Sequence, residues 1–175
     1  MPHPPTGLRL RPLRDEDEPA VRAANDELAA DGFDFALGLD LDVTWSQYRQ
    51  AKIDAHLGRN LPDGWVPASF LIGEIDGQVA GRVSVRHELN DWLFREGGHI
   101  GYGVRPAFRR RGVATEMLRQ GLVVARAQGV NRVLVTCDDD NVGSATVIEL
   151  CGGRLAPDHL RSDGPSPTKR RYWID

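Results

Sequence analysis

The sequence VRPAFRRRGVAT, residues 104–115, runs from the end of a strand-like segment through a basic loop into an amphipathic helical pattern. The first backbone N–H groups of a helix have no partner within the helix, and the helix dipole adds partial positive charge there. Gly112 lets a ligand approach the backbone closely, and Ala114 keeps that approach unobstructed. The three arginines at 109–111 add guanidinium groups whose geometry suits phosphate oxygens. The stretch therefore predicts a cradle for a pyrophosphate group.

The segments on either side of this loop have the patterns of two strands and two helices. Alternation predicts a strand over His99–Val104, and an apolar stripe predicts a helix over about Gly112–Gln128. Arg132–Thr136 is a nearly continuous apolar run, which is typical of a strand buried on both faces. A further helix is expected over about Asn141–Leu150, with Asn141 as its N-cap.

The rest of the chain supplies a first strand, two helices, a hairpin and a last strand. Asp76-Gly77 separates two β-rich runs, and this pair predicts a two-residue hairpin because both turn residues need positive φ. The predicted elements are a strand over 8–13, helices over about 15–30 and 44–57, hairpin strands over 69–75 and 78–87, a Gly/Pro/Ser-rich loop over 158–168 and a strand over 170–174. With residues 1–7 as a disordered or extended tail, the order β-α-α-β-β-β-α-β-α-β predicts one α+β, or mixed α/β, domain over residues 1–175.

Composition excludes several classes of protein. The 175 residues carry 22 basic and 25 acidic side chains, a net charge of −3, which argues against a nucleic-acid binder. A hydrophobic content of 41% supports a packed core rather than disorder. Cys137 and Cys151 lack metal-ligand spacing and the five histidines are scattered, so we expect no metal site. No apolar run resembles a signal peptide or approaches the ~20 residues of a membrane span, so we expect a soluble, cytoplasmic protein without a membrane partner.

The basic loop resembles a known family. Arg109-x-x-Gly112-x-Ala114 matches the R/Q-x-x-G-x-G/A motif of the GCN5-related N-acetyltransferases (GNAT), and it lies between the expected strand and helix. The resemblance implies a GNAT-like acyl-CoA N-acyltransferase fold, with a central splayed mixed β-sheet flanked by helices and acetyl-CoA as cosubstrate in the gap between strands 99–104 and 132–136. It implies these cofactor-binding residues: backbone of Tyr102, Gly103 and Val104 for the pantetheine; Arg109, Arg110, Arg111, Gly112, Val113, Ala114 and Thr115 for the pyrophosphate; and Asn141 and Ser144 on the facing helix. Asn141 also serves as an N-cap in this interpretation, and for Ser144 a place in the first helical turn is preferred to a contact with the ligand.

Acyl transfer to an amine needs a base that takes the proton of the nitrogen. Many relatives use a Glu near the start of the strand before the motif, and Glu96 lies near that place; His99 is chemically suited to the same role. The alternatives are a loop carboxylate and a strand-face histidine. Where many relatives carry a Tyr as general acid, this chain has Ile148, so the thiolate leaves unaided or another group donates. The unranked donors are Tyr102, Cys151 and Tyr172; both cysteines are expected to be buried apolar residues, which predicts direct transfer without an acyl-cysteine.

The acceptor is predicted from charge. Between Asp15 and Asp42 there are ten acids against one base, Arg22, and the family's first helices wall the acceptor side. Asp31, Phe33 and Asp34 are the candidate substrate-binding residues, since carboxylates and aromatic faces suit a small cationic amine. The alternative is a solvated acidic helix face. Acceptor identity and acyl-chain preference stay open, and so does the oligomeric state, although homodimers are common in the family.

Two rival functions remain open on the sequence alone. A catalytically weak acyl-CoA-binding module of the same fold fits Ile148 and the uncertain base. A different nucleotide-binding protein fits the basic loop, but the sequence contains neither GxxxxGK[ST] nor GxGxxG. We therefore expect an N-acetyltransferase that acts on a small-molecule amine.

Overall fold

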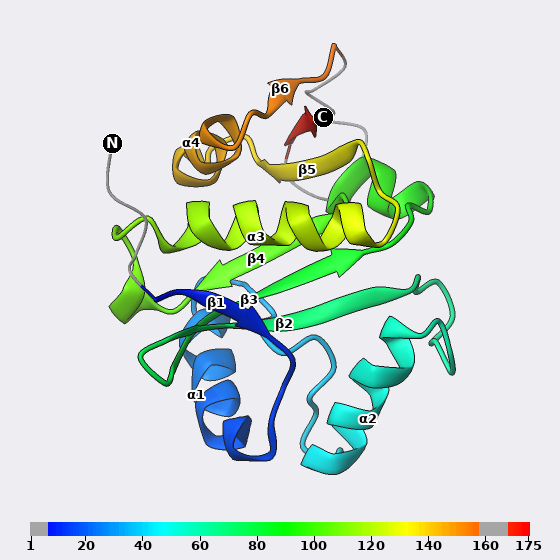
Figure 1. Ribbon diagram of the computed structural model, residues 1–175, viewed down its shortest axis with the longest axis vertical. Coiled ribbons are helices and arrows are strands. Elements are labelled where there is room, and N and C mark those ends of the chain that lie inside the picture. Colours follow the sequence, from blue (N-terminus) through cyan, green and yellow to red (C-terminus); the bar gives the residue numbers. More distant parts are fainter. Residues whose placement is uncertain (1–6, 158–167) are drawn as a thin grey trace.

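The computed structural model describes residues 7–157 and 168–175 and contains two sheets and four α-helices in those ranges (Figure 1). Residues 1–6 of the predicted tail, and all of the predicted Gly/Pro/Ser-rich loop except Thr168, lie outside the described residues. The mixed α/β architecture predicted from the sequence is confirmed. Two short elements were not predicted: the two-residue strand β6 (Arg154–Leu155) and a π-helical turn, η2 (Leu93–Gly97).

The larger sheet has four antiparallel strands in the order β1-β2-β3-β4. Its strands are β1 (Arg9–Arg11), β2 (Ala68–Ile75), β3 (Gln78–Arg86) and β4 (Ile100–Val104). Helices α1 (Glu18–Ala29) and α2 (Trp45–His56) lie on one face, and α3 (Val113–Ala127) lies on the other (Figure 1). Short 3₁₀ turns precede α1 and α3 at η1 (Asp15–Asp17) and η3 (Pro106–Phe108).

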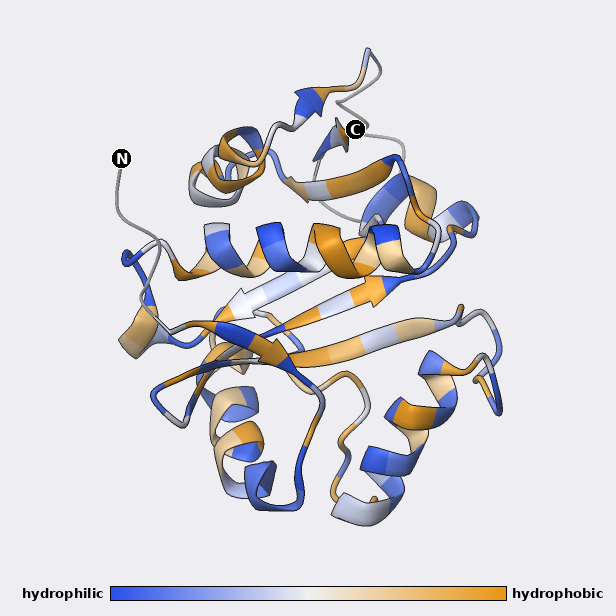
Figure 2. Cartoon of the chain, viewed as in Figure 1, coloured by the Kyte–Doolittle hydropathy of each residue, from blue (hydrophilic) through white to orange (hydrophobic). Residues whose placement is uncertain are grey.

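The second sheet has the antiparallel order β5-β7-β6 and carries α4 (Val142–Leu150) beside it. Strand β5 (Val133–Asp138) pairs along its length with β7 (Lys169–Ile174). In Figure 2, β5 is coloured as hydrophobic over most of its length, and residues 133–135 are fully buried, as its apolar run predicted. Side chains of β5 therefore pack in the same buried cluster as side chains of α3 and α4, and both faces of the strand are covered.

Local turn and capping chemistry explains where the elements begin and end. Asp76 and Gly77 have φ of 49° and 77°, which is the double positive φ that a two-residue hairpin needs. Thr44 caps α2 by accepting from the Gln47 N–H at 3.2 Å, and Asn141 caps α4 by accepting from the Ser144 N–H at 3.0 Å. These predictions from sequence are confirmed.

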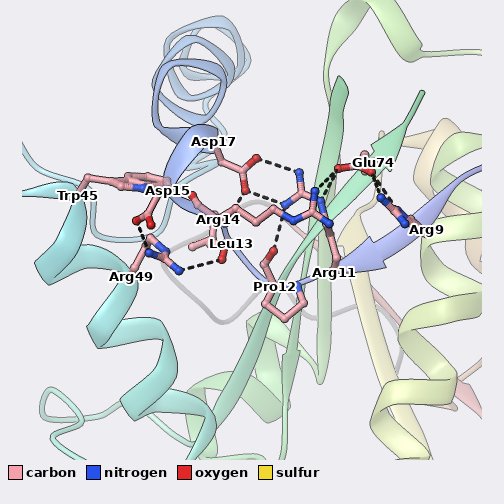
Figure 3. Close-up of polar contacts among 10 residues, drawn as sticks. All are labelled: Arg9, Arg11, Pro12, Leu13, Arg14, Asp15, Asp17, Trp45, Arg49 and Glu74. Carbon is pink, nitrogen blue, oxygen red and sulfur yellow. Dashed lines mark hydrogen bonds and ion pairs between the residues drawn. The ribbon is translucent and has the colours of Figure 1, made fainter. Parts of the chain in front are cut away.

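Buried ion pairs attach the start of α1 to the sheet (Figure 3). Arg11 donates to both carboxylate oxygens of Asp17, at 2.7 and 2.9 Å, and also to Glu74 on β2. Arg9 and Arg14 donate to the same Glu74 carboxylate. Arg11, Asp17 and Glu74 are each at least nine-tenths buried, and charges at that depth need such partners. The network fixes the direction in which the chain leaves β1 for α1.

The two sheets meet at one junction. The backbone N–H of His99, directly before β4, donates to the Leu134 carbonyl at 2.7 Å. The Leu134 N–H donates in return to His99 Nδ1 at 2.9 Å. Gly98 has φ of +64°, and a Cβ there would lie 2.6 Å from the Leu134 carbonyl oxygen, so the close approach requires glycine. Beyond this point β4 and β5 share no ladder in the described residues, and a gap opens between them.

Acid is expected to weaken this junction. Burial, reinforced by nearby Arg86, lowers the pKa of His99 to about 4, whereas histidine in an unfolded chain titrates near ~6.5. Between these two pKa values the imidazole is protonated in the unfolded state and neutral in the folded state, so the free energy of unfolding rises with pH. We expect the titration of His99 to lower the free energy of unfolding by about 2 kcal/mol as the pH falls from neutral to about 4.5. Denaturant unfolding over this range measures it. His99→Gln should flatten the slope; equal slopes for wild type and His99→Gln would contradict the assignment.

Candidate active site

The gap between β4 and β5 widens into a cleft of about 910 Å³. Its walls come from β4, from the loop and first turn over residues 108–115, from the end of β5, and from α4. Arg82 and Arg86 of β3 and the segment after α1 line it from the other face of the sheet. The His99–Leu134 junction closes one end, and the basic loop lies at the opposite end of β4.

Strand β4 presents unpaired peptide groups to this cleft. Arg86 N–H donates to the His99 carbonyl at 2.7 Å, and Arg105 N–H donates to the Ala80 carbonyl at 2.9 Å. Antiparallel pairing alternates along a strand, so the odd-numbered residues between these bonds face β3. The peptide groups of Tyr102 therefore face the gap, as does the N–H of Val104, whose carbonyl accepts from Arg109 Nε at 3.0 Å. Such an edge can bind an extended amide-containing chain.

The first turn of α3 is left without a side-chain cap. Its N-cap is Gly112, which has φ of +74° and no side chain to accept from the amides of the turn. This differs from α2 and α4, which Thr44 and Asn141 cap. Arg110 also has positive φ, at +60°, a conformation that costs a non-glycine residue about 1 kcal/mol. Residues 113–115 of this uncapped turn line the cleft, so an anion bound there would accept from their amides.

The structure separates the arginines of the loop. Arg110 lines the cleft and has no ion-pair partner among the described residues. Arg109 also lines the cleft, but its Nη2 donates to Asp31 at 2.7 Å. Arg111 is exposed and lies outside the lining. Arg105 turns toward α1, where it holds Glu27 with two hydrogen bonds of 2.9 and 2.7 Å. Of the guanidinium groups that line the cleft from the loop, only that of Arg110 is thus free for phosphate in the described structure.

Helix α4 faces the cleft through small residues and one hydroxyl. Ser144 Oγ lies 2.8 Å from the Tyr102 hydroxyl, and this pair bridges α4 and β4. Burial raises the pKa of Tyr102, so its hydroxyl stays protonated at neutral pH. Asn141 uses its carbonyl oxygen as the cap of α4, which leaves its NH₂ group facing the cleft region. Ile148 is fully buried in the core and does not line the cleft.

The two candidate bases have different surroundings. The Nδ1 of His99 accepts from Leu134, its pKa is lowered to about 4, and it does not line the cleft. The Nδ1 of His99 is thus engaged at the junction, and the lowered pKa makes this imidazole a weak proton acceptor near neutral pH. Glu96 neighbours Gly97 of the cleft wall, and its carbonyl accepts from Thr136 Oγ1 at 2.6 Å. The Oε2 of Glu96 is buried and has no hydrogen-bond partner in the described ranges, so this oxygen is free to accept a hydrogen bond.

The candidate proton donors and the two cysteines differ in whether they line the cleft. Tyr172 is fully buried and its hydroxyl donates to Glu149 at 2.9 Å, away from the cleft. Cys151 Sγ contacts the carbonyl of Thr115 at 3.6 Å, and Cys137 lines the cleft. Burial raises the pKa of both thiols, which lowers the fraction present as nucleophilic thiolate. Tyr102 is the one predicted proton donor that lines the cleft in the described structure.

The predicted acceptor residues lie beside the cofactor loop and the buried arginines. Asp31 is paired with Arg109, as given above. Asp34 Oδ1 accepts from the Leu37 N–H at 2.8 Å, so this carboxylate closes a turn of its own loop. The ring of Phe33 stacks under the guanidinium group of Arg82, and the Cζ of Arg82 lies 4.5 Å from the ring centroid. Arg82 and Arg86 were not among the site residues predicted from the sequence; the available signal was the polar alternation Arg82, Ser84, Arg86 in a strand buried on both faces.

The sequence over residues 7–154 matches the family described as an acetyltransferase (GNAT) domain. The chain belongs to the GNAT acetyltransferase family. No curated protein sequence matches it significantly. The cosubstrate of this family is acetyl-CoA, and the open β4 edge, the uncapped α3 turn and Arg110 fit its pantetheine and pyrophosphate groups.

Solved structures agree with this assignment. An acetyltransferase from Agrobacterium tumefaciens str. C58 is 25% identical, with a TM-score of 0.64 over 97% of this chain and 91% of that chain. RimJ of Mycobacterium smegmatis, solved with CoA-disulfide, is 24% identical, with a TM-score of 0.65 over 97% of this chain and 83% of that one. The yncA protein of Salmonella typhimurium, solved with its cofactor acetyl-CoA, is 16% identical, with a TM-score of 0.64 over 97% and 94% of the two chains. The last two likenesses concern the fold.

Within the described ranges, no group of three or more His, Cys, Asp or Glu side chains is arranged to hold a metal ion. The same ranges contain no helix with the length and apolar character that a bilayer crossing requires.

The unequal positions of the loop arginines lead to a direct comparison. Arg110→Ala should weaken CoA binding about tenfold or more, because it removes a charge-assisted contact to phosphate. Arg111→Ala, which removes the same charge from outside the cleft, should change the dissociation constant less than about twofold. Calorimetric titration of CoA at two salt concentrations measures both. Equal losses in the two variants would show that the loop acts only through its overall charge.

Proposed function

We propose that this protein is an acetyl-CoA-dependent N-acetyltransferase that transfers the acetyl group directly to the primary amine of a small molecule. The observation that carries the proposal is the cleft in which an unpaired β4 edge leads to an uncapped α3 turn beside Arg110. An extended pantetheine fits the edge and a pyrophosphate fits the turn, so the thioester lies toward the His99–Leu134 junction.

In this proposal Glu96 receives the proton of the acceptor amine, directly or through a water molecule. An alkylammonium has a pKa of ~10.4 and must lose a proton before its nitrogen attacks the thioester carbonyl. Glu96 directly precedes Gly97 of the cleft wall in the sequence and is not itself among the lining residues, and its Oε2 is buried without a hydrogen-bond partner in the described ranges. The attack forms the C–N bond, collapse of the adduct breaks the C–S bond and releases the CoA thiolate, and the cationic nitrogen of the adduct loses its second proton to that thiolate or to solvent.

The Tyr102–Ser144 hydroxyl pair is the proposed partner of that thiolate. The raised pKa of Tyr102 makes its hydroxyl a hydrogen-bond donor that keeps its own proton. A thiolate with an ordinary thiol pKa of ~8.5 is a good leaving group, so stabilisation by a hydrogen bond suffices and Ile148 needs no substitute. The raised pKa values of Cys137 and Cys151 favour direct transfer over an acyl-cysteine.

The contacts on the acceptor side give little support for the predicted second positive charge on the acceptor. Of the acids predicted to attract a second positive charge, Asp31 is ion-paired with Arg109, whereas Asp34 accepts from the Leu37 N–H and has no ion-pair partner in the described ranges. One structural neighbour, an acetyltransferase from Salmonella typhimurium, modifies the N-terminal serine of the 50S ribosomal subunit protein L7/L12, so a protein amino terminus is the competing acceptor. A small cationic amine remains within the proposal, but the acceptor needs no positive charge beyond its amine.

The second candidate is an acyl-CoA-binding module of the same fold. The observation in its favour is that the α4 position at which many relatives carry a tyrosine holds Ile148. It predicts CoA binding without turnover.

Turnover with acetyl-CoA separates the two candidates. We expect amine-dependent release of CoA thiol and an acetylated product detectable by mass spectrometry from a panel of small primary amines. The Cys137→Ala/Cys151→Ala double variant should still turn over, because no acyl-enzyme is needed. Tight CoA binding with no product from any amine would favour the binding module. Loss of turnover in a folded double variant would contradict direct transfer.

Glu96→Gln tests the proposed base. The amide cannot accept the proton, so kcat should fall about 100-fold, the lower range for general-base catalysis, while CoA affinity stays within about twofold. Glu88→Gln, on an exposed carboxylate of the preceding segment, is the matched control and should retain wild-type kcat. A Glu96→Gln enzyme with unchanged kcat across pH 6–9 would remove Glu96 from the mechanism.

A further inference from the structure

Two arginines of β3 line the junction end of the cleft. Arg82 and Arg86 lie on the same face of the strand, as alternate positions do, and both contribute to the cleft wall. Arg82 is 3% exposed, and Arg86 is half-buried. Neither forms an ion pair with a carboxylate in the described ranges.

The two guanidinium groups are close together. Gly101 of β4 lies opposite them, and a Cβ at this residue would be 3.3 Å from Arg86 Nη1 and 3.5 Å from Arg82 Nη1. Both cations therefore lie over the same glycine, where the missing side chain makes room for them. Like charges this close and this shielded from water oppose each other's ionisation. Burial, reinforced by Arg86, lowers the pKa of Arg82 to about 9, and burial also lowers the pKa of Arg86.

Neutral carbonyl groups hold the pair in position. Arg82 donates to the carbonyls of Phe35, Gly101 and Asp34 at 2.9, 3.2 and 2.8 Å. This side chain is thereby fixed between β4 and the segment after α1. Arg86 uses Nη1 for the carbonyls of Gly97 and Gly98, at 3.1 and 3.4 Å. Its Nε and Nη2 donate to no described residue, so this guanidinium retains donors for a ligand.

Two carboxylates that line the cleft are already in ion pairs. Asp31 pairs with Arg109, and Asp138 pairs with Lys169. Arg110 lies at the opposite end, beside the α3 turn assigned to the pyrophosphate. Asp34 is the carboxylate close enough to favour the charge of Arg82, but its Oδ1 is taken by the Leu37 N–H. Neither Asp34 nor Glu96 forms an ion pair with Arg82 or Arg86 in the described ranges, so the free Nε and Nη2 donors of Arg86 are available to an anionic group on the acceptor.

We propose that the acceptor is a small primary amine that also carries a carboxylate, and that Arg86 binds this carboxylate while Arg82 positions it and adds to the positive potential. This inference rests on the proposed function, because it names the substrate class of the same site. An amine and a carboxylate that both reach the junction end are separated by only a few bonds, which describes an amino acid or a close analogue. Arg86, with free donors in fork geometry, is the specificity-determining residue.

Matched acceptors test the charge requirement. Glycine, L-alanine, L-leucine and L-phenylalanine are each assayed as the free acid and as the carboxamide, with kcat/KM calculated per unprotonated amine. Linear diamines supply the cationic arm, and tripeptides with the same first residues supply the amino-terminus arm. We expect the best free acid to exceed its carboxamide, the diamines and the tripeptides by about tenfold or more, as for a charge-assisted contact. Carboxamides, diamines or tripeptides that match or exceed the free acids would overturn the proposal.

Arg86→Gln should raise KM for the best acid about tenfold or more and leave kcat/KM for its carboxamide within about twofold. Arg86→Lys should recover part of the discrimination, because it restores the charge without the fork. Arg95→Gln, which removes an exposed arginine from the neighbouring turn, is the control and should behave as wild type. Folding of each variant is checked by thermal unfolding, and unchanged discrimination in folded Arg86→Gln would contradict the role of Arg86.

Binding separates this inference from the proposed function. The same free acids are titrated by calorimetry into the protein saturated with CoA, which requires no turnover. Binding of an acid that Arg86→Gln loses and Arg95→Gln keeps supports the carboxylate site even if the chain proves a binding module. Turnover of amines without any preference for acids supports the acetyltransferase and overturns the carboxylate site. The absence of both acid binding and acid turnover also overturns it.

Discussion

The junction between His99 and Leu134 is the constraint on which the site depends. Two reciprocal hydrogen bonds, one to a backbone carbonyl and one to an imidazole, join the sheets at a single point. Gly98 permits the approach, and the strands then diverge because β4 pairs with β3 and β5 pairs with β7. The outer edge of β4 is left open for a ligand, and the α3 turn lies at the far end of that edge. A continuous sheet would have satisfied these groups and closed the cleft.

The features that sequence predicts well are those determined within a few residues. The Asp76-Gly77 turn and the Thr44 and Asn141 caps follow from the chemistry of single side chains next to their own backbone. The basic loop before α3 belongs to the same class, because a glycine N-cap and its neighbouring residues are contiguous. The family resemblance depends on this stretch, and the match over residues 7–154 confirms it.

The features that sequence misses are pairings between distant segments. Arg109 meets Asp31 and Arg105 meets Glu27 across 78 positions, so one predicted acceptor residue and two basic residues of the loop are neutralised. Packing of α1 against the loop decides these partners, and no local pattern encodes it. His99 is a reasonable base by its ordinary pKa, but burial at the junction changes that chemistry. The same dependence on tertiary contacts concealed Arg82 and Arg86, whose guanidinium groups form no ion pair among the described residues.

Hydrogen exchange of the backbone amides with and without CoA tests the central claim most directly. The account predicts slower exchange at Tyr102 and Val104 on the open edge of β4 and at residues 113–115 of the α3 turn. The β2–β3 hairpin, whose amides are already paired, should keep its exchange rates. Protection limited to the basic loop, with the β4 amides unchanged by saturating CoA, would contradict the binding of the cosubstrate between the splayed strands.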